Sequence, residues 1–153
     1  MEAGRHGVAR YAGRLLAVLW CGIAVSACEF QSSAPPRAPE SRAEYFVEKL
    51  IREPQAVDEL RNVARLAEGA NPDSLAYDLP ARTALTYLRA RQRLGAKFGL
   101  HVASTQKTTA DSRVVNVVVS AGATALNEGE AVHFQVEMQK QEGAWLVTRL
   151  RSN

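Results

Sequence analysis

The chain has 153 residues, of which 46% are hydrophobic, and this is the size of one ordinary globular domain with short accessory segments rather than two domains. The formal net charge is +3, but Arg5, Arg10 and Arg14 against Glu2 give the first 27 residues +2 and leave +1 for the rest. So small a charge gives nucleic-acid binding no support, and we expect no nucleic-acid partner.

The first segment has the charge and hydropathy pattern of an export signal. Its three arginines precede a charge-free apolar run of 13 residues, Leu15 to Ala27. A helix needs roughly 20 apolar residues to cross a bilayer, so this run is too short to span one comfortably. A basic flank, a short apolar core and small residues before a cut are typical of secretory signal peptides. We therefore expect residues 1–27 to be removed on export.

The end of this run resembles the lipobox of bacterial lipoproteins. Val25, Ser26, Ala27 and Cys28 supply, in order, the branched aliphatic residue, the small residue, the Ala or Gly, and the required cysteine of that motif. The resemblance implies that the Cys28 thiol receives a diacylglycerol, that a dedicated signal peptidase recognises the three preceding residues and cuts before Cys28, and that the new amine is often acylated. Two alternatives stay open: a conventional cut near Ala27 that leaves a free Cys28 thiol, and a retained membrane-spanning anchor.

A lipidated Cys28 implies a protein anchored to a membrane and facing the periplasm or the cell exterior. Glu29 follows the cysteine, whereas Asp at this position is associated with inner-membrane retention in some Gram-negative groups, so the outer membrane is slightly favoured. Residues 29–40 (EFQSSAPPRAPE) are rich in Pro and Ser, which predicts an extended tether of about 35 Å. The expected organisation is a signal peptide (1–27), an acylated cysteine with its tether (28–40), and one folded domain (41–153).

The domain begins with apolar residues at helical spacing, which predicts helices over 41–52, from Pro54 to Gly69, and from Pro80 to the Gly95 or Gly99 region. Ser41 followed by Glu44 is a capping-box signature for the start of the first helix. Proline suits the first turn of the second and third helices. The turn cluster 69–73 (GANPD) separates them.

Beyond the third helix the period of the pattern changes from helix to strand. Alternating or β-branched residues predict four strands, near 98–103, 114–119, 132–138 and 144–150. Their connections are short and turn-rich, as in an antiparallel meander. Helices first and strands last predict an α+β fold, with about three N-terminal helices packed on a curved four-stranded antiparallel sheet.

The closing segment, Gly143-Ala144-Trp145-Leu146-Val147 after an alternating strand and a QEG turn, resembles the last hairpin of nuclear-transport-factor-two-like domains. These cystatin-like, cone-shaped domains are common in small secreted bacterial proteins. The resemblance covers about residues 41–153 and implies a cone of sheet and helices. That fold often has a helix between its first and second strands, and the sequence shows none there. A simpler layout of three helices and four strands therefore stays open.

Residues that catalyse reactions or bind metals do not form a recognisable motif in this sequence. The histidines His101 and His133 both fall on the polar phase of their strands, so we expect them to be exposed. Tyr77, Asp78 and Tyr87 are possible occupants of a pocket. Metalloprotease, zinc, serine-hydrolase and phosphate-loop spacings are absent. We accordingly expect no catalytic residue, no metal and no cofactor.

A basic stripe is the remaining candidate site. Arg82, Arg89, Arg93 and Lys97 recur near one side of the third predicted helix, where they could meet anionic lipid headgroups or an acidic partner. The alternative is an ordinary solvated helix face. We interpret the chain as a membrane-anchored envelope lipoprotein whose small non-catalytic domain binds an envelope protein, a lipid or a small molecule through its concave sheet surface or this helix. The alternative class is a cone-fold enzyme, isomerase-like or hydratase-like, with a polar pocket.

Overall fold

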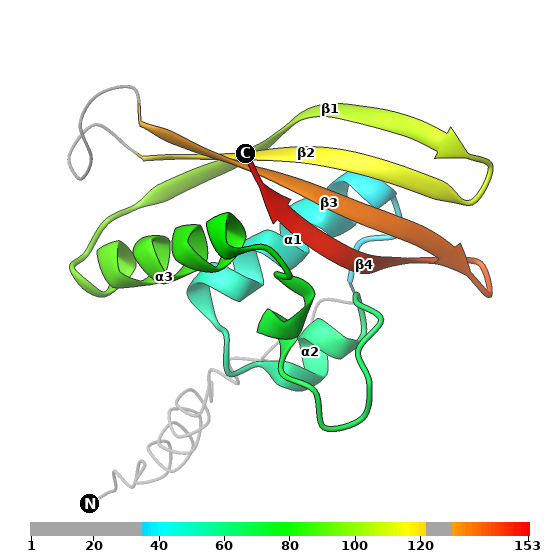
Figure 1. Cartoon of the computed structure of the whole chain (residues 1–153), viewed down its shortest axis with the longest axis horizontal. Coiled ribbons are helices and arrows are strands. Elements are labelled where there is room, and N and C mark those ends of the chain that lie inside the picture. The colour runs from blue at the N-terminus through cyan, green and yellow to red at the C-terminus, as the bar shows by residue number, and fades with distance from the viewer. Residues whose placement is uncertain (1–34, 122–129) are drawn as a thin grey trace, which may run out of the picture. The chain divides into compact units, whose positions relative to one another are not determined.

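The computed structural model describes residues 35–121 and 130–153 (Figure 1). Its helical segments are α1 (Pro39–Arg52), α2 (Val57–Arg61), the 3₁₀ helix η1 (Pro72–Leu75) and α3 (Leu79–Arg93). Its strands are β1 (Phe98–Thr109), β2 (Ser112–Ala121), β3 (Ala131–Gln141) and β4 (Ala144–Ser152). The predicted signal peptide and the lipobox residues Val25, Ser26, Ala27 and Cys28 lie outside the described residues.

The four strands form one curved antiparallel sheet in the order β1-β2-β3-β4. This confirms the predicted α+β class and the antiparallel meander. The turn between β3 and β4 consists of Glu142 and Gly143, with φ of 49° and 85°. Two central residues with positive φ match the right-handed twist of a tight hairpin, which explains the glycine at this position.

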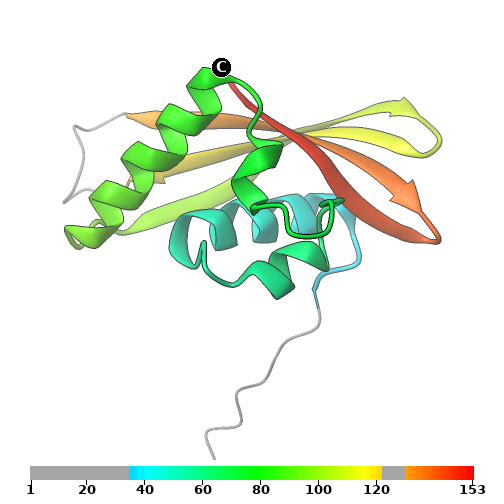
Figure 2. The ribbon, with the colours of Figure 1, turned by 60° about the horizontal axis from the view of Figure 1, so that its bottom comes forward.

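One face of the sheet takes part in the hydrophobic core. Alternate strand residues and the apolar stripes of α1 and α3 belong to one buried cluster, which includes Phe46, Leu50, Leu85, Leu88, Val117, Phe134 and Val136. Figure 2 shows the helices on this side of the sheet, which we call the helix side. The opposite, outer face carries His101 and His133, which both pair across the strands with Val118. Both histidines are exposed, as their phase predicts.

Helix α1 begins two residues before the predicted start. Ala38 is its N-cap and makes no side-chain capping bond, while Ser41 lies inside the first turn, so the predicted capping box is wrong. Pro39 has a backbone angle already suited to a helix start, and the carboxylate of Glu40 favours the positive end of the helix dipole. The helix ends at Arg52 as predicted. The last two residues of the predicted tether are therefore helical.

The predicted second helix is wrong at both ends, because α2 begins at Val57 instead of Pro54 and already ends at Arg61. Val63 and Ala64 are buried, but this segment lies along β4 instead of continuing the helix. The Val147 N–H donates to the Val63 carbonyl at 2.9 Å, and the Arg65 N–H donates to the Val147 carbonyl at 2.8 Å. A short helix gains little by itself, so pairing with a distant strand outweighs the local helical pattern.

The third helix follows its predicted signals more closely. Asp78 is the N-cap of α3, and its Oδ1 accepts a hydrogen bond from the Ala81 N–H at 2.8 Å. Pro80 lies in the first turn as expected. Strand β1, in contrast, extends to Thr109, well beyond the predicted 98–103, and has a bulge between Val102 and Ser104. Its second half is polar on both faces, so alternation could not mark it, yet it pairs with β2 as an edge strand.

Candidate functional site

The structure places Arg89, the centre of the predicted basic stripe, in an internal ion pair. Its Nη1 and Nη2 each donate to a carboxylate oxygen of Asp73 at 2.7 Å, and its Nε donates to the Leu50 carbonyl at 2.8 Å. The Arg89 side chain is only 16% exposed. These contacts join α3 to η1 and to the end of α1. Arg89 therefore holds elements of the domain together instead of presenting its charge to a partner.

The other stripe residues have different surroundings. Arg82 is exposed, and its Nε donates to the Ala76 carbonyl at 2.7 Å. Arg93 and Lys97 are exposed near the C-terminal end of α3, and neither forms an ion pair with another described residue. Of the four predicted stripe residues, Arg93 and Lys97 are therefore exposed and make no ion pair with another described residue, whereas Arg82 and Arg89 make hydrogen bonds within the domain.

Two surface hollows lie beside the Asp73–Arg89 pair. One of about 370 Å³ is lined in part by Asp73 and Arg82, and the other, of about 190 Å³, is lined in part by Arg52, Arg89 and Arg93. Arg52 is itself paired with Glu48, Nε to Oε1, at 3.1 Å. Since Asp73 is engaged by Arg89, its carboxylate is not a free base in the first hollow. The charge of the second hollow is balanced internally except at Arg93.

The three candidate pocket residues do not come together in a pocket. The Asp78 carboxylate caps α3, and the Tyr87 hydroxyl donates to Oε2 of Glu130 at 3.2 Å. Tyr77 lies beside β4 and is 41% exposed. Each of the three has a structural contact of its own. Nothing in these contacts assembles a pair of groups for acid–base chemistry.

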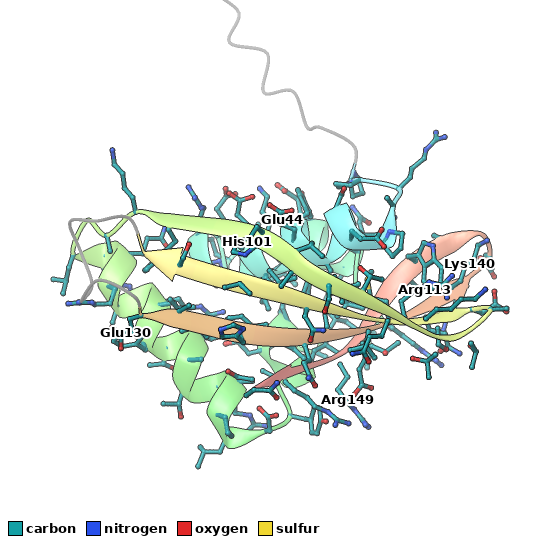
Figure 3. All side chains as sticks on the ribbon, turned by 90° about the horizontal axis from the view of Figure 1, so that it is seen from above. Glu44, His101, Arg113, Glu130, Lys140 and Arg149 are labelled. Carbon is teal, nitrogen blue, oxygen red and sulfur yellow. The ribbon has the colours of Figure 1, made fainter. Side chains whose placement is uncertain are left out.

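Tyr77 belongs instead to a surface cluster that the sequence analysis missed. The guanidinium carbons of Arg149 and Arg151 lie 4.5 and 5.1 Å from the centre of its ring. Both arginines also pair with Glu137, at 3.9 and 2.8 Å. Arg149 is labelled on the sheet in Figure 3. The alternating charges of strands β3 and β4 were the available signal, but Tyr77 precedes α3 and no local pattern connects it to them.

The interior is apolar with one exception among the described residues. Arg42 of α1 is 7% exposed, and its guanidinium donates to the carbonyls of Pro36, at 3.2 Å, and of Asn62. Its described hydrogen-bond partners include no carboxylate. Burial lowers the pKa of Arg42 from its ordinary value, because desolvation disfavours the charged form. Arg42 ties the segment before α1 to the segment after α2.

The chain has no match among protein-family models, and no curated protein is significantly similar to it. Within residues 35–121 and 130–153, no three His, Cys, Asp or Glu side chains are grouped so that they could hold a metal ion. None of the described helices has the length and hydropathy to span a bilayer. The chain's own residues are therefore the basis for a functional proposal.

Proposed function

We propose that this protein is a lipid-anchored protein of the bacterial cell envelope and that its folded domain is a non-catalytic binding module. The observation that carries the proposal is the tetrapeptide Val25-Ser26-Ala27-Cys28 at the end of a short, charge-free apolar run. Acylation of the Cys28 thiol and of the new amine would supply the two or three chains that stable anchoring requires. The domain would face the periplasm or the cell exterior, with the outer membrane slightly favoured.

The surroundings of the polar residues favour a binding module over a cone-fold isomerase or hydratase. Such an enzyme needs two ionisable groups that converge in an enclosed pocket. Among the described residues, Arg42 is the one charged side chain in the interior, and its hydrogen bonds go to backbone carbonyls. Tyr77, Asp78 and Tyr87 make separate contacts at the surface. A binding role needs only the exposed surface.

The resemblance to nuclear-transport-factor-two-like domains remains part of this proposal. Two isolated parallel bridges, Ala64 with Val147 and Ala76 with Leu150, place short extended segments beside β4 before α3 begins. Extended segments ahead of the last helix are compatible with a cone-shaped domain. Between β1 and β2 the chain forms only a short turn, so the simpler layout of three helices and four strands stays the alternative.

Replacement of the lipobox cysteine tests the anchor. We expect Cys28→Ala to abolish incorporation of labelled fatty acid and to leave an unprocessed precursor that migrates more slowly. Cys21→Ala is the matched control, because Cys21 follows Trp20 rather than a small residue and would leave with the signal peptide. This control should be labelled and cleaved normally. Fatty acid that persists on Cys28→Ala, or a mature chain that begins with a free Cys28 thiol, would refute the anchor.

A further inference from the structure

Four side chains form a cationic and aromatic surface at one end of the sheet, and we call this surface the basic end. Its members are Lys107 of β1, Arg113 of β2, Lys140 of β3 and Trp145 of β4. Lys107 pairs with Arg113 and Lys140 pairs with Trp145 across the strands. The guanidinium carbon of Arg113 lies 4.9 Å from the centre of the Trp145 ring. Figure 3 shows Arg113 and Lys140 together at this end of the molecule.

The basic end lies on the helix side of the sheet. Arg113 pairs with Met138, and Met138 pairs with Val147, and both of these partners belong to the buried core. Nearer the middle of the sheet this side is occupied by the helices' apolar side chains, which form one cluster with the strands. At the turn end, Lys107 and Lys140 remain exposed and Trp145 is half-buried. The basic end is thus a part of this sheet face that the helices leave accessible.

The charges of the basic end are not neutralised by described carboxylates. Lys107, Arg113 and Lys140 take part in none of the ion pairs among the described residues. The acidic residues nearest in sequence, Asp111 and Glu142, occupy the two turns. Glu137 lines a surface hollow together with Arg113, but its ion pairs are with Arg149 and Arg151. The sheet surface between the turns and the core therefore carries cations beside an indole.

The folded chain begins on the same side of the domain. Figures 1 and 2 show the start of α1 toward the turns that join β1 to β2 and β3 to β4. Arg42 holds the carbonyl of Pro36 to the domain, so the fold includes the chain from this residue onward. Only seven residues separate Pro36 from Cys28. They span at most about 30 Å even when fully extended.

We propose that the basic end contacts an anionic lipid surface, that of the membrane in which the protein is anchored. The proposal rests on the proposed lipid anchor, because a short tether from Cys28 keeps this side of the domain near the headgroups. Lysine and arginine are attracted to anionic lipids, and their long stems let the charge reach the interface. An indole suits the headgroup region, because one part of it is apolar and its N–H is polar.

The fluorescence of Trp145 can be used to test this lipid contact. Trp145 is the sole tryptophan of the mature chain, since Trp20 lies in the predicted signal peptide. The acylated full-length mature protein is reconstituted in phosphatidylcholine vesicles that carry a headgroup nitroxide quencher, with and without phosphatidylglycerol. We expect quenching of Trp145 emission to be about twofold or more stronger with phosphatidylglycerol and to decline as salt is raised. Equal quenching in neutral and anionic vesicles would overturn the proposal.

Two charge-reversal variants locate the contact. Lys107→Glu with Lys140→Glu should remove the phosphatidylglycerol-dependent quenching, whereas Arg93→Glu with Lys97→Glu, which changes the net charge equally, should retain it. Arg113 is left intact because its Nη1 donates to the Thr109 and Ser112 carbonyls near the turn. Unchanged circular dichroism in both variants shows that each one folds. Loss of quenching in the Arg93→Glu, Lys97→Glu variant alone would assign the contact to the predicted stripe and refute the basic end.

The same assay separates this proposal from the anchor. If Cys28 carries no fatty acid, the anchor is refuted, and the unacylated full chain carrying Trp20→Phe, in which Trp145 is again the sole tryptophan, is then added to the same vesicles. Quenching that still depends on phosphatidylglycerol and on Lys107 and Lys140 would support the basic end as a lipid-binding surface by itself. Quenching that is absent, or independent of these lysines, would refute it.

Discussion

Replacement of Arg89 by methionine provides the sharpest test of the internal ion pair. The change removes two hydrogen bonds to Asp73 and one to the Leu50 carbonyl. Breaking a fully buried pair costs about 3–5 kcal/mol, whereas an exposed pair contributes at most about 1 kcal/mol. The Arg89 side chain is 16% exposed, but the Asp73 side chain is 40% exposed, so water can solvate the carboxylate left behind. We therefore expect Arg89→Met to lower the free energy of unfolding by about 2 kcal/mol.

This loss is measurable by urea and thermal unfolding of the mature chain, followed by far-ultraviolet circular dichroism. For a domain of this size, about 2 kcal/mol lowers Tm by roughly 5–10 °C. Arg93→Met is the matched control, with an expected change within about 0.5 kcal/mol because Arg93 is exposed and unpaired among the described residues. Asp73→Asn should add little further loss in the Arg89→Met background. Equal stabilities of the Arg89 and Arg93 variants, or full additivity with Asp73→Asn, would refute the structural role.

Two further predictions concern acid stability and backbone conformation. The pKa of Glu59 is lowered from its ordinary 4.5, chiefly by a hydrogen bond from Lys49 Nζ and then by one from the Tyr45 hydroxyl. The charged Glu59 side chain therefore stabilises the fold above pH 4.5, and this contribution is lost as the pH falls through the lowered pKa of the folded state. Glu59→Gln should therefore reduce the drop in Tm between about pH 7 and about pH 3, whereas a drop as large as that of the wild type would contradict this role. Gly143→Ala should cost about 1 kcal/mol in urea unfolding, because Gly143 has a φ of 85° and no other atom obstructs a Cβ there. The control Gly99→Ala should leave the free energy of unfolding nearly unchanged. Equal urea midpoints for the two variants would contradict the destabilising effect of the positive φ at Gly143.

The parts of the fold that the sequence predicted correctly are those with strong local signals. Asp78 and Pro80 mark the start of α3 because capping and a fixed proline angle act within a few residues. The alternation in β3 is plain because one face is buried and the other is not. His101 and His133 were placed correctly on the outer face for the same reason.

Contacts between residues far apart in the sequence explain where the sequence-based expectations for the second helix and for Arg89 differ from the structure. Val63 and Ala64 continue a helical apolar pattern, yet they pair with β4, which no local signal could reveal. Likewise, helical periodicity placed Arg89 on a shared stripe but could not show that Asp73 folds back to meet it. Periodicity predicts which residues share a face, whereas the partner of a long side chain depends on the tertiary structure.

The basic end shows how strongly side-chain direction depends on two irregularities in the sheet. From buried Phe98, strict alternation would place Lys107 on the outer face, but the bulge between Val102 and Ser104 shifts the phase and brings Lys107 to the helix side. Strict alternation from buried Leu150 would likewise place Trp145 on the outer face. The register shift between Glu137 and Met138 of the partner strand brings it to the helix side, in phase with Val147. If the lipid-contact proposal is correct, these two irregularities are functional, because together they place a lysine and the indole beside Arg113 and Lys140.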